Sequence, residues 1–277
     1  MDKIEVKVID VAGDPGRMAG FLARLTQRGH TIKCMDDLEA LMDKPVSSGL
    51  IKSIAGLPHG TIKRFCPITI AIVGASRRFL AQARTSQVGT NFVSASLQYS
   101  DYSEDASFVV PYAIMEADAA HTFTLYGDNV PVATTRSTAH QDAYLQSCRG
   151  SMETYRHLAE AAGNDAAGYA APQGLRNILI MQANHQAWEY WIRLRGCNRN
   201  TVETQYVTML IWEELLKTPF GEEFFGNCGP DCMTMGCREG KMACKDPLRQ
   251  MAREAKALGI PVPRHIINQR WPLITKH

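Results

Sequence analysis

The chain has 277 residues, of which 45% are hydrophobic and 21% are charged, and its formal net charge is +2. This is an ordinary globular composition, and the near-neutral charge gives no reason to expect nucleic-acid binding. No apolar run reaches the roughly 18 residues that a membrane span needs. The N-terminus lacks the basic and then apolar pattern of a signal peptide, so we expect a cytoplasmic protein without a membrane partner.

The first part of the chain mixes strand and helix patterns. Apolar and charged residues alternate over residues 3–10, which predicts a half-buried strand. Residues 13–29 predict a helix, since Asp14 suits the N-cap, Pro15 the first helical position and Gly29 the end. Further elements are expected in this order: short helices over 37–45 and 47–56, a strand over 68–74, a helix over 75–83, and short strands over 106–115 and 121–127.

The second part of the chain has mainly helical patterns. We expect three longer helices: 137–163 from an N-cap at Ser137 to a stop at Gly163, 171–196 opened by Pro172, and 202–218. A mixed front and a helical back predict an α+β fold. We place one α+β domain at residues 1–220 and a cysteine-rich C-terminal tail with a short helix at 221–277.

One stripe of the expected helix over 171–196 combines an arginine with tryptophans. Asn184, Trp188, Trp191 and Arg195 are spaced by four, three and four residues, which places them on one helix face. The tryptophans fit either a core or a ligand contact. A guanidinium in an apolar stripe needs an acceptor, because an unpaired buried charge is very costly. That acceptor is either a carboxylate such as Glu203 or a carbonyl or phosphate of a ligand.

Four of the eight cysteines crowd into the tail. Cys228, Cys232, Cys237 and Cys244 follow the pattern C-x3-C-x4-C-x6-C. Four thiolates can surround a tetrahedral zinc ion, which would be structural because no coordination position stays open. The alternative is a turn-rich tail with free thiols, and the absence of a secretion signal argues against a disulfide framework.

Common catalytic motifs are missing from the sequence. It has no Walker loop, no G-x-G-x-x-G after a strand and no H-E-x-x-H. Lone histidines such as His59, His140 and His157 give no triad by themselves. The function must therefore be sought in longer segments.

Three long segments carry a family resemblance. They are "GLPHGTIKRFCPITIAIVGASRRFLAQ" at 56–82, "AAPQGLRNILIMQANHQAWEYWIRLRGCNRNTVETQ" at 170–205 and "GPDCMTMGCREGKMAC" at 229–244. In this order the chain resembles the flavin-dependent thymidylate synthases, the ThyX family. Its signature, R-H-R and then S-x-R after seven or eight residues, aligns with Thr85-Ser86-Gln87, eight residues, and Ser96-Leu97-Gln98. The spacing is kept and every basic residue of the signature is gone.

Other positions also depart from the family pattern. The expected glutamate after the G-H-x-S/T motif falls on Arg64, although His59 and Thr61 match. The arginine before the family's L-P falls on Gly168, and the arginine of N-x-R falls on Gln186. The family's A-Q-W becomes Asn200-Thr201-Val202. The retained family positions are Gln82, Ser96, Pro172, Asn184, Arg195, Arg199 and Glu203.

The resemblance implies a fold, a reaction and a set of site residues. It implies a mixed sheet with long helices and a homotetramer whose sites combine several subunits. FAD would be the cofactor, NADPH and methylenetetrahydrofolate the cosubstrates, and C5 of dUMP or a related pyrimidine nucleotide the acceptor. The implied catalytic residues are Arg195 and Ser96; the substrate-binding residues are Gln82, Ser96, Leu97, Gln98 and Arg195; the cofactor-binding residues are Thr61, Thr85, Ser86, Gln87, Asn184, Gln186, Tyr190 and Arg199.

The lost arginines leave three functional hypotheses. The first is a divergent flavoenzyme of this family that acts on dUMP or another pyrimidine nucleotide. The second is a paralogue that binds a nucleotide or a protein partner without flavin chemistry. The third is a structural assembly protein whose tail binds a metal or a partner. Intact helix caps, apolar stripes and loop lengths favour a folded, functioning protein.

Overall fold

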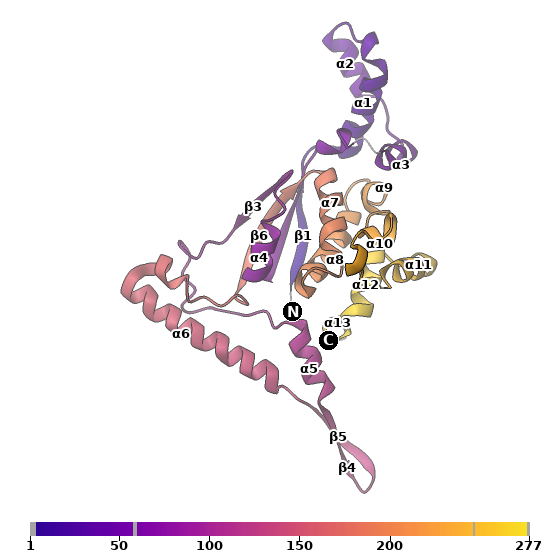
Figure 1. Ribbon diagram of the computed structural model, residues 1–277. Coiled ribbons are helices and arrows are strands. Elements are labelled where there is room, and N and C mark those ends of the chain that lie inside the picture. The colour runs from indigo at the N-terminus through magenta and orange to yellow at the C-terminus, as the bar shows by residue number, and fades with distance from the viewer. Residues whose placement is uncertain (1–3, 58–59, 246, 276–277) are drawn as a thin grey trace.

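A four-stranded antiparallel sheet forms the centre of the computed structural model, which describes residues 4–57, 60–245 and 247–275 (Figure 1). Its strand order is β1-β2-β6-β3. The strands are β1 (Glu5–Val11), β2 (Ile68–Ser76), β6 (Arg176–Ala183) and β3 (Thr90–Ser94). The sheet pairs segments that are far apart in the sequence, so the turn after residue 83 lies beside the segment that follows residue 183.

The prediction of one long helix over 171–196 is wrong. Residues Arg176–Ala183 form β6, whose buried and less buried residues alternate, and α7 (His185–Arg195) begins only after it. Pro172 begins a turn instead of a helix, because its carbonyl accepts a hydrogen bond from the amide of Leu175 at 3.0 Å. β6 pairs with β2 on one side and β3 on the other, so its backbone hydrogen bonds are made within the sheet. This tertiary pairing overrides the local helix signals of the segment.

Helices α7 and α8 (Val202–Leu216) lie beside the sheet and bury most of the aromatic core (Figure 1). Trp188, Trp191 and Trp212 are almost completely buried there. The indole nitrogen of Trp188 donates to the carbonyl of Ile68 on β2 at 3.2 Å, which ties α7 to the sheet. The core interpretation of the two stripe tryptophans is therefore confirmed, as is the predicted helix over 202–218 in all but its last two residues.

Three helices form an arm at one end of the molecule (Figure 1). They are α1 (Pro15–Arg28), α2 (Met35–Met42) and α3 (Ser48–Gly56). The predicted start of the first is confirmed, because the carboxylate of Asp14 accepts from the amide of Arg17 at 2.9 Å. The expected strand over 68–74 and the helix over 75–83 correspond to β2 and α4 (Arg77–Ala83).

The tail contributes to the main core. Its α-helices among the described residues are α9 (Gly221–Phe225), α10 (Asp231–Thr234), α11 (Leu248–Leu258), α12 (Val262–Arg270) and α13 (Pro272–Thr275). Leu248, Ala255, Ile266 and Trp271 are buried in the same cluster as the sheet residues. The tail is thus more helical than the single short helix that its composition suggested. No helix within the described ranges has the length and apolar content to cross a bilayer.

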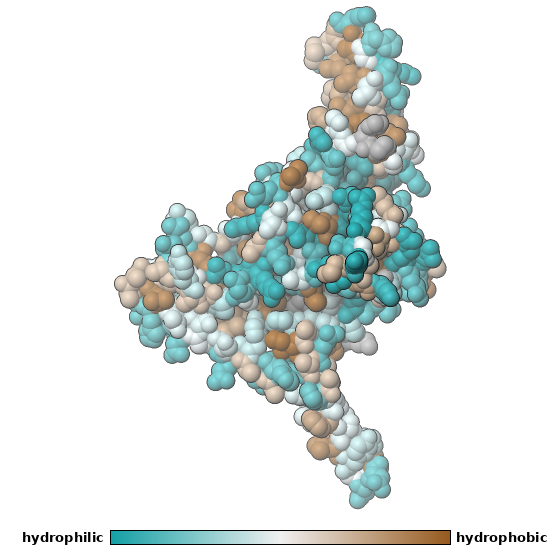
Figure 2. Space-filling model, viewed as in Figure 1, coloured by the Kyte–Doolittle hydropathy of each residue, from teal (hydrophilic) through white to brown (hydrophobic). Residues whose placement is uncertain are grey.

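The long helix α6 (Ala139–Ala167) and a β-hairpin extend from the other end (Figure 1). The helix was expected over 137–163; Gly163 interrupts its geometry with a φ of 83°, and α6 continues for one more turn. The hairpin pairs β4 (Thr122–Gly127), which corresponds to the strand expected over 121–127, with β5 (Val130–Arg136). Its apolar side chains are exposed, and Figure 2 shows brown surface on this projection beside white surface and a teal tip. The expected strand over 106–115 is wrong, because α5 (Tyr112–Ala120) begins inside it.

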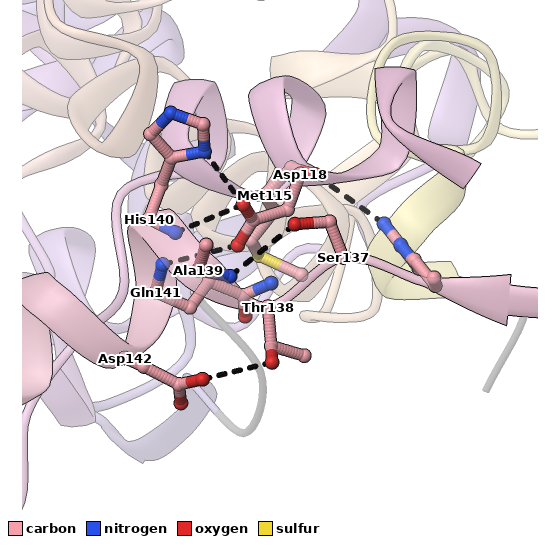
Figure 3. Close-up of polar contacts among 9 residues, drawn as sticks. Met115, Asp118, Ser137, Thr138, Ala139, His140, Gln141 and Asp142 are labelled. Atoms are coloured by element: carbon pink, nitrogen blue, oxygen red, sulfur yellow. Dashed lines mark hydrogen bonds and ion pairs between the residues drawn. The ribbon is translucent and has the colours of Figure 1, made fainter. Parts of the chain in front are cut away.

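A buried carboxylate fixes the base of this hairpin (Figure 3). Asp118 of α5 is fully buried and accepts hydrogen bonds from the amides of His140 and Gln141 at 3.0 Å and from the His140 Nδ1 at 2.7 Å. Burial alone would raise the pKa of Asp118, but these hydrogen bonds hold that pKa well below its ordinary value. Asp118 therefore joins α5 to the first turn of α6 as an anion.

We expect Asp118→Asn to lower the unfolding midpoint by several degrees at neutral pH. Because the folded-state pKa lies below the ordinary value of 3.8, this stabilisation is complete above that value and is lost as the pH falls toward the folded pKa. The gap between wild type and variant should narrow in thermal scans at decreasing pH. Asp128→Asn, in the exposed hairpin turn, is the control, and a gap that does not depend on pH would contradict the prediction.

Candidate functional site

A cavity of about 630 Å³ lies between α7 and the turn that joins α4 to β3. We call it the α7 cavity. It is lined by Arg64, Thr85, Ser86, Gln87, Val88, Gly89, Thr90, Asn184, Gln186, Ala187, Tyr190, Trp191, Leu194 and Arg195. None of these described lining residues is acidic. Its size is typical of small-molecule sites.

The N-terminus of α7 is built to receive this turn. Asn184 caps the helix, and its side-chain oxygen accepts from the amide of Ala187 at 2.9 Å. Gly89 has a φ of 73° and passes so close that an added Cβ would lie 3.2 Å from the Ala187 Cβ and 3.3 Å from the Asn184 amide nitrogen. Only glycine combines this φ with this close approach without strain.

Arg195 holds the same turn from the other end of α7. Its Nη2 donates to the carbonyl of Gln82 at 3.1 Å, to the Thr85 hydroxyl at 2.6 Å and to the Ser86 hydroxyl at 2.9 Å. Its Nη1 donates to the Asn200 side-chain oxygen at 3.3 Å. Partial burial lowers the pKa of the guanidinium from its ordinary value. All these acceptors are neutral, so none of them offsets the positive charge of Arg195 at the cavity wall.

Glu203, one of the two kinds of acceptor considered for Arg195, has other partners. Glu203 accepts instead from the amide of Ser76 at 2.7 Å and from the Ser76 hydroxyl at 2.5 Å. Burial raises the pKa of Glu203, and the hydrogen bonds from Ser76 oppose that rise. The carboxylate thus joins the end of β2 to α8, and the acceptors that the structure gives Arg195 are neutral protein groups.

A second guanidinium enters the cavity from another element. Arg64, in the short 3-10 helix Ile62–Arg64, donates from Nε to the side-chain oxygen of Gln186 at 2.7 Å. Gly60 approaches the same side chain so closely that an added Cβ would lie 2.1 Å from the Gln186 Nε2. In the sequence, Arg64 and Gln186 are two separate departures from the family pattern. Arg64 places a positive charge where a glutamate is expected, and Gln186 replaces an expected arginine with a neutral amide that accepts from Arg64.

Most of the predicted cofactor residues meet in this cavity. Thr85, Ser86, Gln87, Asn184, Gln186 and Tyr190 all line it, together with Arg195. Two predicted cofactor residues lie elsewhere: Thr61 precedes the 3-10 helix that carries Arg64, and Arg199 donates to the carbonyl of Met242 beside a neighbouring cavity. His59 lies outside the described residues.

The remaining predicted substrate residues do not line the α7 cavity. Gln82 accepts from the hydroxyls of Thr201 and Thr204 at 2.8 and 2.6 Å, so its side chain ties α4 to α8. Ser96 accepts from the amide of Gln98 at 3.1 Å, and Leu97 packs against the cluster around Tyr155. Within one chain, residues 96–98 and Arg195 are therefore not parts of one pocket.

The predicted zinc site is not formed. No group of three or more His, Cys, Asp or Glu residues within the described ranges is arranged to hold a metal ion. Cys232, Cys237 and Cys244 line a cavity of about 260 Å³ together with Cys197, but Cys228 lies apart from it. Burial raises the pKa of the Cys228 thiol, which opposes the thiolate that a zinc ligand requires. The C-x3-C-x4-C-x6-C spacing allowed a site that the fold of the tail does not assemble.

Comparison with known proteins identifies the family. The sequence profile described as thymidylate synthase complementing protein matches residues 7–218. The chain belongs to this family, ThyX. The resemblance and the α+β fold are thus confirmed, whereas the boundary at residue 220 stays a prediction. No curated protein matches the chain.

Solved structures share the ThyX fold with this chain. The UMP/dUMP methylase PolB from Streptomyces cacaoi, bound with 5-Br dUMP, is 18% identical, with a TM-score of 0.60 over 82% of this chain and 97% of that one. A thymidylate synthase X from Helicobacter pylori with FAD and dUMP is 17% identical, with a TM-score of 0.55 over 81% and 98%. A second Helicobacter pylori ThyX structure with FAD and dUMP is 18% identical, with a TM-score of 0.55 over 81% and 99%.

We expect Arg195→Ala to loosen the turn after α4. The variant removes the donor that Gln82, Thr85 and Ser86 share, and each hydrogen bond to a charged group contributes about 1.5–3 kcal/mol when buried and less at this half-exposed position. Amide exchange over residues 84–88 should become faster while β6 stays protected. Arg253→Ala on α11 is the control. Unchanged exchange over 84–88 would contradict the tethering role.

Proposed function

We propose that this protein is an FAD-dependent thymidylate synthase-like enzyme that transfers one carbon reductively to C5 of dUMP or a related pyrimidine nucleotide. The observation that supports the proposal most is the composition of the α7 cavity. Six of the eight positions that the ThyX resemblance gives to the flavin line one cavity with Arg195. They do so although the R-H-R signature has become Thr85-Ser86-Gln87.

The residues of the α7 cavity fit a ligand that is both aromatic and anionic. Arg64 and Arg195 supply positive charge, and none of the described lining residues cancels it with a carboxylate. Hydroxyls and side-chain amides of the turn and of α7 supply neutral hydrogen-bonding groups. Leu194 and the exposed ring of Tyr190 offer apolar surface for a flat ring system. FAD combines a flat ring with a pyrophosphate, so the lining suits it.

A bound reduced flavin would supply the hydride for this reaction. The chain's own residues would bind and orient the reactants. We propose that Arg195 donates hydrogen bonds to the uracil carbonyl edge and so favours an electron-rich C5, and that Ser96 with the amides of Leu97 and Gln98 receives the nucleotide phosphate. NADPH would reduce the flavin, and methylenetetrahydrofolate would provide the carbon.

We further propose a cytoplasmic homotetramer with shared sites. Ser96, Leu97 and Gln98 do not line the same pocket as Arg195 within one chain. A site that needs both groups can be completed when residues 96–98 come from a second copy. Symmetric assembly would supply such a copy to every subunit.

The second candidate is a family member that binds a pyrimidine nucleotide without flavin chemistry. It is favoured by the internal use of Arg195, whose donors bind Gln82, Thr85, Ser86 and Asn200. A guanidinium held by protein oxygens is less available to a cofactor than one with free donors. The loss of all four basic side chains of the signature would also weaken flavin binding.

We expect the purified protein to bind FAD. After incubation with FAD and desalting, the visible absorption spectrum should keep the flavin bands, and their intensity should report the bound fraction. Riboflavin should be retained less well, because it lacks the pyrophosphate that the two arginines favour. Loss of all flavin on desalting, even from a large excess, would contradict the flavin proposal and favour the second candidate.

We expect thymidylate to form in a complete reaction. Protein, FAD, NADPH, methylenetetrahydrofolate and dUMP are incubated, and the product is measured by mass spectrometry against a reaction without protein. Arg195→Ala should lower the rate by about 100-fold or more, as the loss of an electrostatic donor at the reacting centre typically does. Arg253→Ala is the matched control, and product formation that is equal in both variants would overturn the role of Arg195.

A further inference from the structure

We propose that Arg64 is an anion-binding residue of the α7 cavity, where it contacts a phosphate or pyrophosphate group of the ligand. The proposal rests on the proposed function for the identity of that ligand as a flavin dinucleotide or a pyrimidine nucleotide. The geometry of Arg64, Gln186 and Gly60 carries it, together with the absence of neutralising charge in the described lining.

The Arg64 side chain is held at the cavity by a single hydrogen bond. Its Nε donates to Gln186 at 2.7 Å, and Gln186 lies in the first turn of α7. The structure gives the two Nη groups of Arg64 no partner among the described residues. The guanidinium is thus positioned through one nitrogen, while the nitrogens that make bidentate contacts with phosphate stay available.

Gln186 lies close to the backbone at Gly60, where the lack of a Cβ leaves room for its side-chain amide: an added Cβ would lie 2.1 Å from the Gln186 Nε2. Arg64 is an exposed side chain, and its hydrogen bond to Gln186 directs the guanidinium toward the cavity that both residues line. An arginine already directed toward the cavity loses less rotamer freedom on binding a ligand there than one without a partner.

The charges around Arg64 also favour an anion. Arg195 lines the same cavity, but its N–H groups donate hydrogen bonds to neutral protein oxygens. The nearest acidic group of α7, Glu189, lines an adjoining cavity and is paired with Lys63 at 2.7 Å. Arg64 is therefore the arginine of this cavity that combines an uncompensated charge with free donors within the described part of the chain.

The simplest alternative is that Arg64 only holds Gln186 in place. In that case its removal would weaken every ligand of the cavity equally, because the shape of the wall would change. An anion-binding role predicts a selective effect on phosphate-bearing ligands. Comparing each charged ligand with its neutral analogue separates the two.

The experiment measures dissociation constants of FAD, riboflavin, dUMP and deoxyuridine for wild type and three variants. Arg64→Gln removes the charge and keeps an amide. The double variant Arg64→Gln with Gln186→Arg moves the charge across the same hydrogen bond. Arg253→Gln on α11 makes the same change in net charge away from the cavity. Inorganic pyrophosphate is tested in parallel by thermal shift.

We expect Arg64→Gln to weaken FAD or dUMP roughly tenfold, as the loss of one charge-assisted contact does, and to leave riboflavin and deoxyuridine unchanged. Which charged ligand is affected shows which phosphate Arg64 contacts. The double variant should recover most of the loss, and Arg253→Gln should show none. The dependence of binding on salt concentration should become less steep in Arg64→Gln.

Equal weakening of charged and neutral ligands, or no weakening at all, would overturn the proposal. If wild type binds no flavin and no dUMP, the proposed function fails. The role of Arg64 is then decided by pyrophosphate alone: stabilisation of the wild type that is lost in Arg64→Gln supports it. Absence of that stabilisation overturns it.

Discussion

The junction between β6 and α7 is the constraint on which the candidate site depends. β6 ends at Ala183, and Asn184 turns the chain directly into α7 by accepting from the amide of Ala187. The indole of Trp188 then ties the first turn of the helix to β2. Because the Asn184 cap and the Trp188 hydrogen bond fix this end of α7, Gly89 can pass closely beside it and form one wall of the cavity.

The second wall is held by charge that the protein uses internally. Arg195 gathers Gln82, Thr85 and Ser86, so the turn that lacks the family arginines is ordered by an arginine of α7. Neutral hydroxyls at these positions are good acceptors for a guanidinium, whereas arginines would repel it. The same substitutions that remove cationic contacts for a ligand therefore allow Arg195 to close onto the turn.

Local signals predicted local structure well and mispredicted the segment before α7. The N-cap at Asp14 and the helix over 202–218 follow from short-range patterns and are present. Residues 171–196 contain a proline, apolar residues and a tryptophan stripe that all fit a helix. Arg176–Ala183 is a strand because it pairs with β2 and β3. No residue within the segment indicates these partners.

The sequence by itself determined the family, the α+β class and seven of the residues that meet in the α7 cavity, because their order and spacing match a known pattern. Only the tertiary structure decided which groups touch. It paired Glu203 with Ser76 instead of Arg195, separated Cys228 from the other tail cysteines, and joined Arg64 to Gln186 across the cavity. The two hydrogen bonds join residues that are more than 100 positions apart, and the placement of Cys228 depends on packing of the tail, so spacing along the chain carries little information about them.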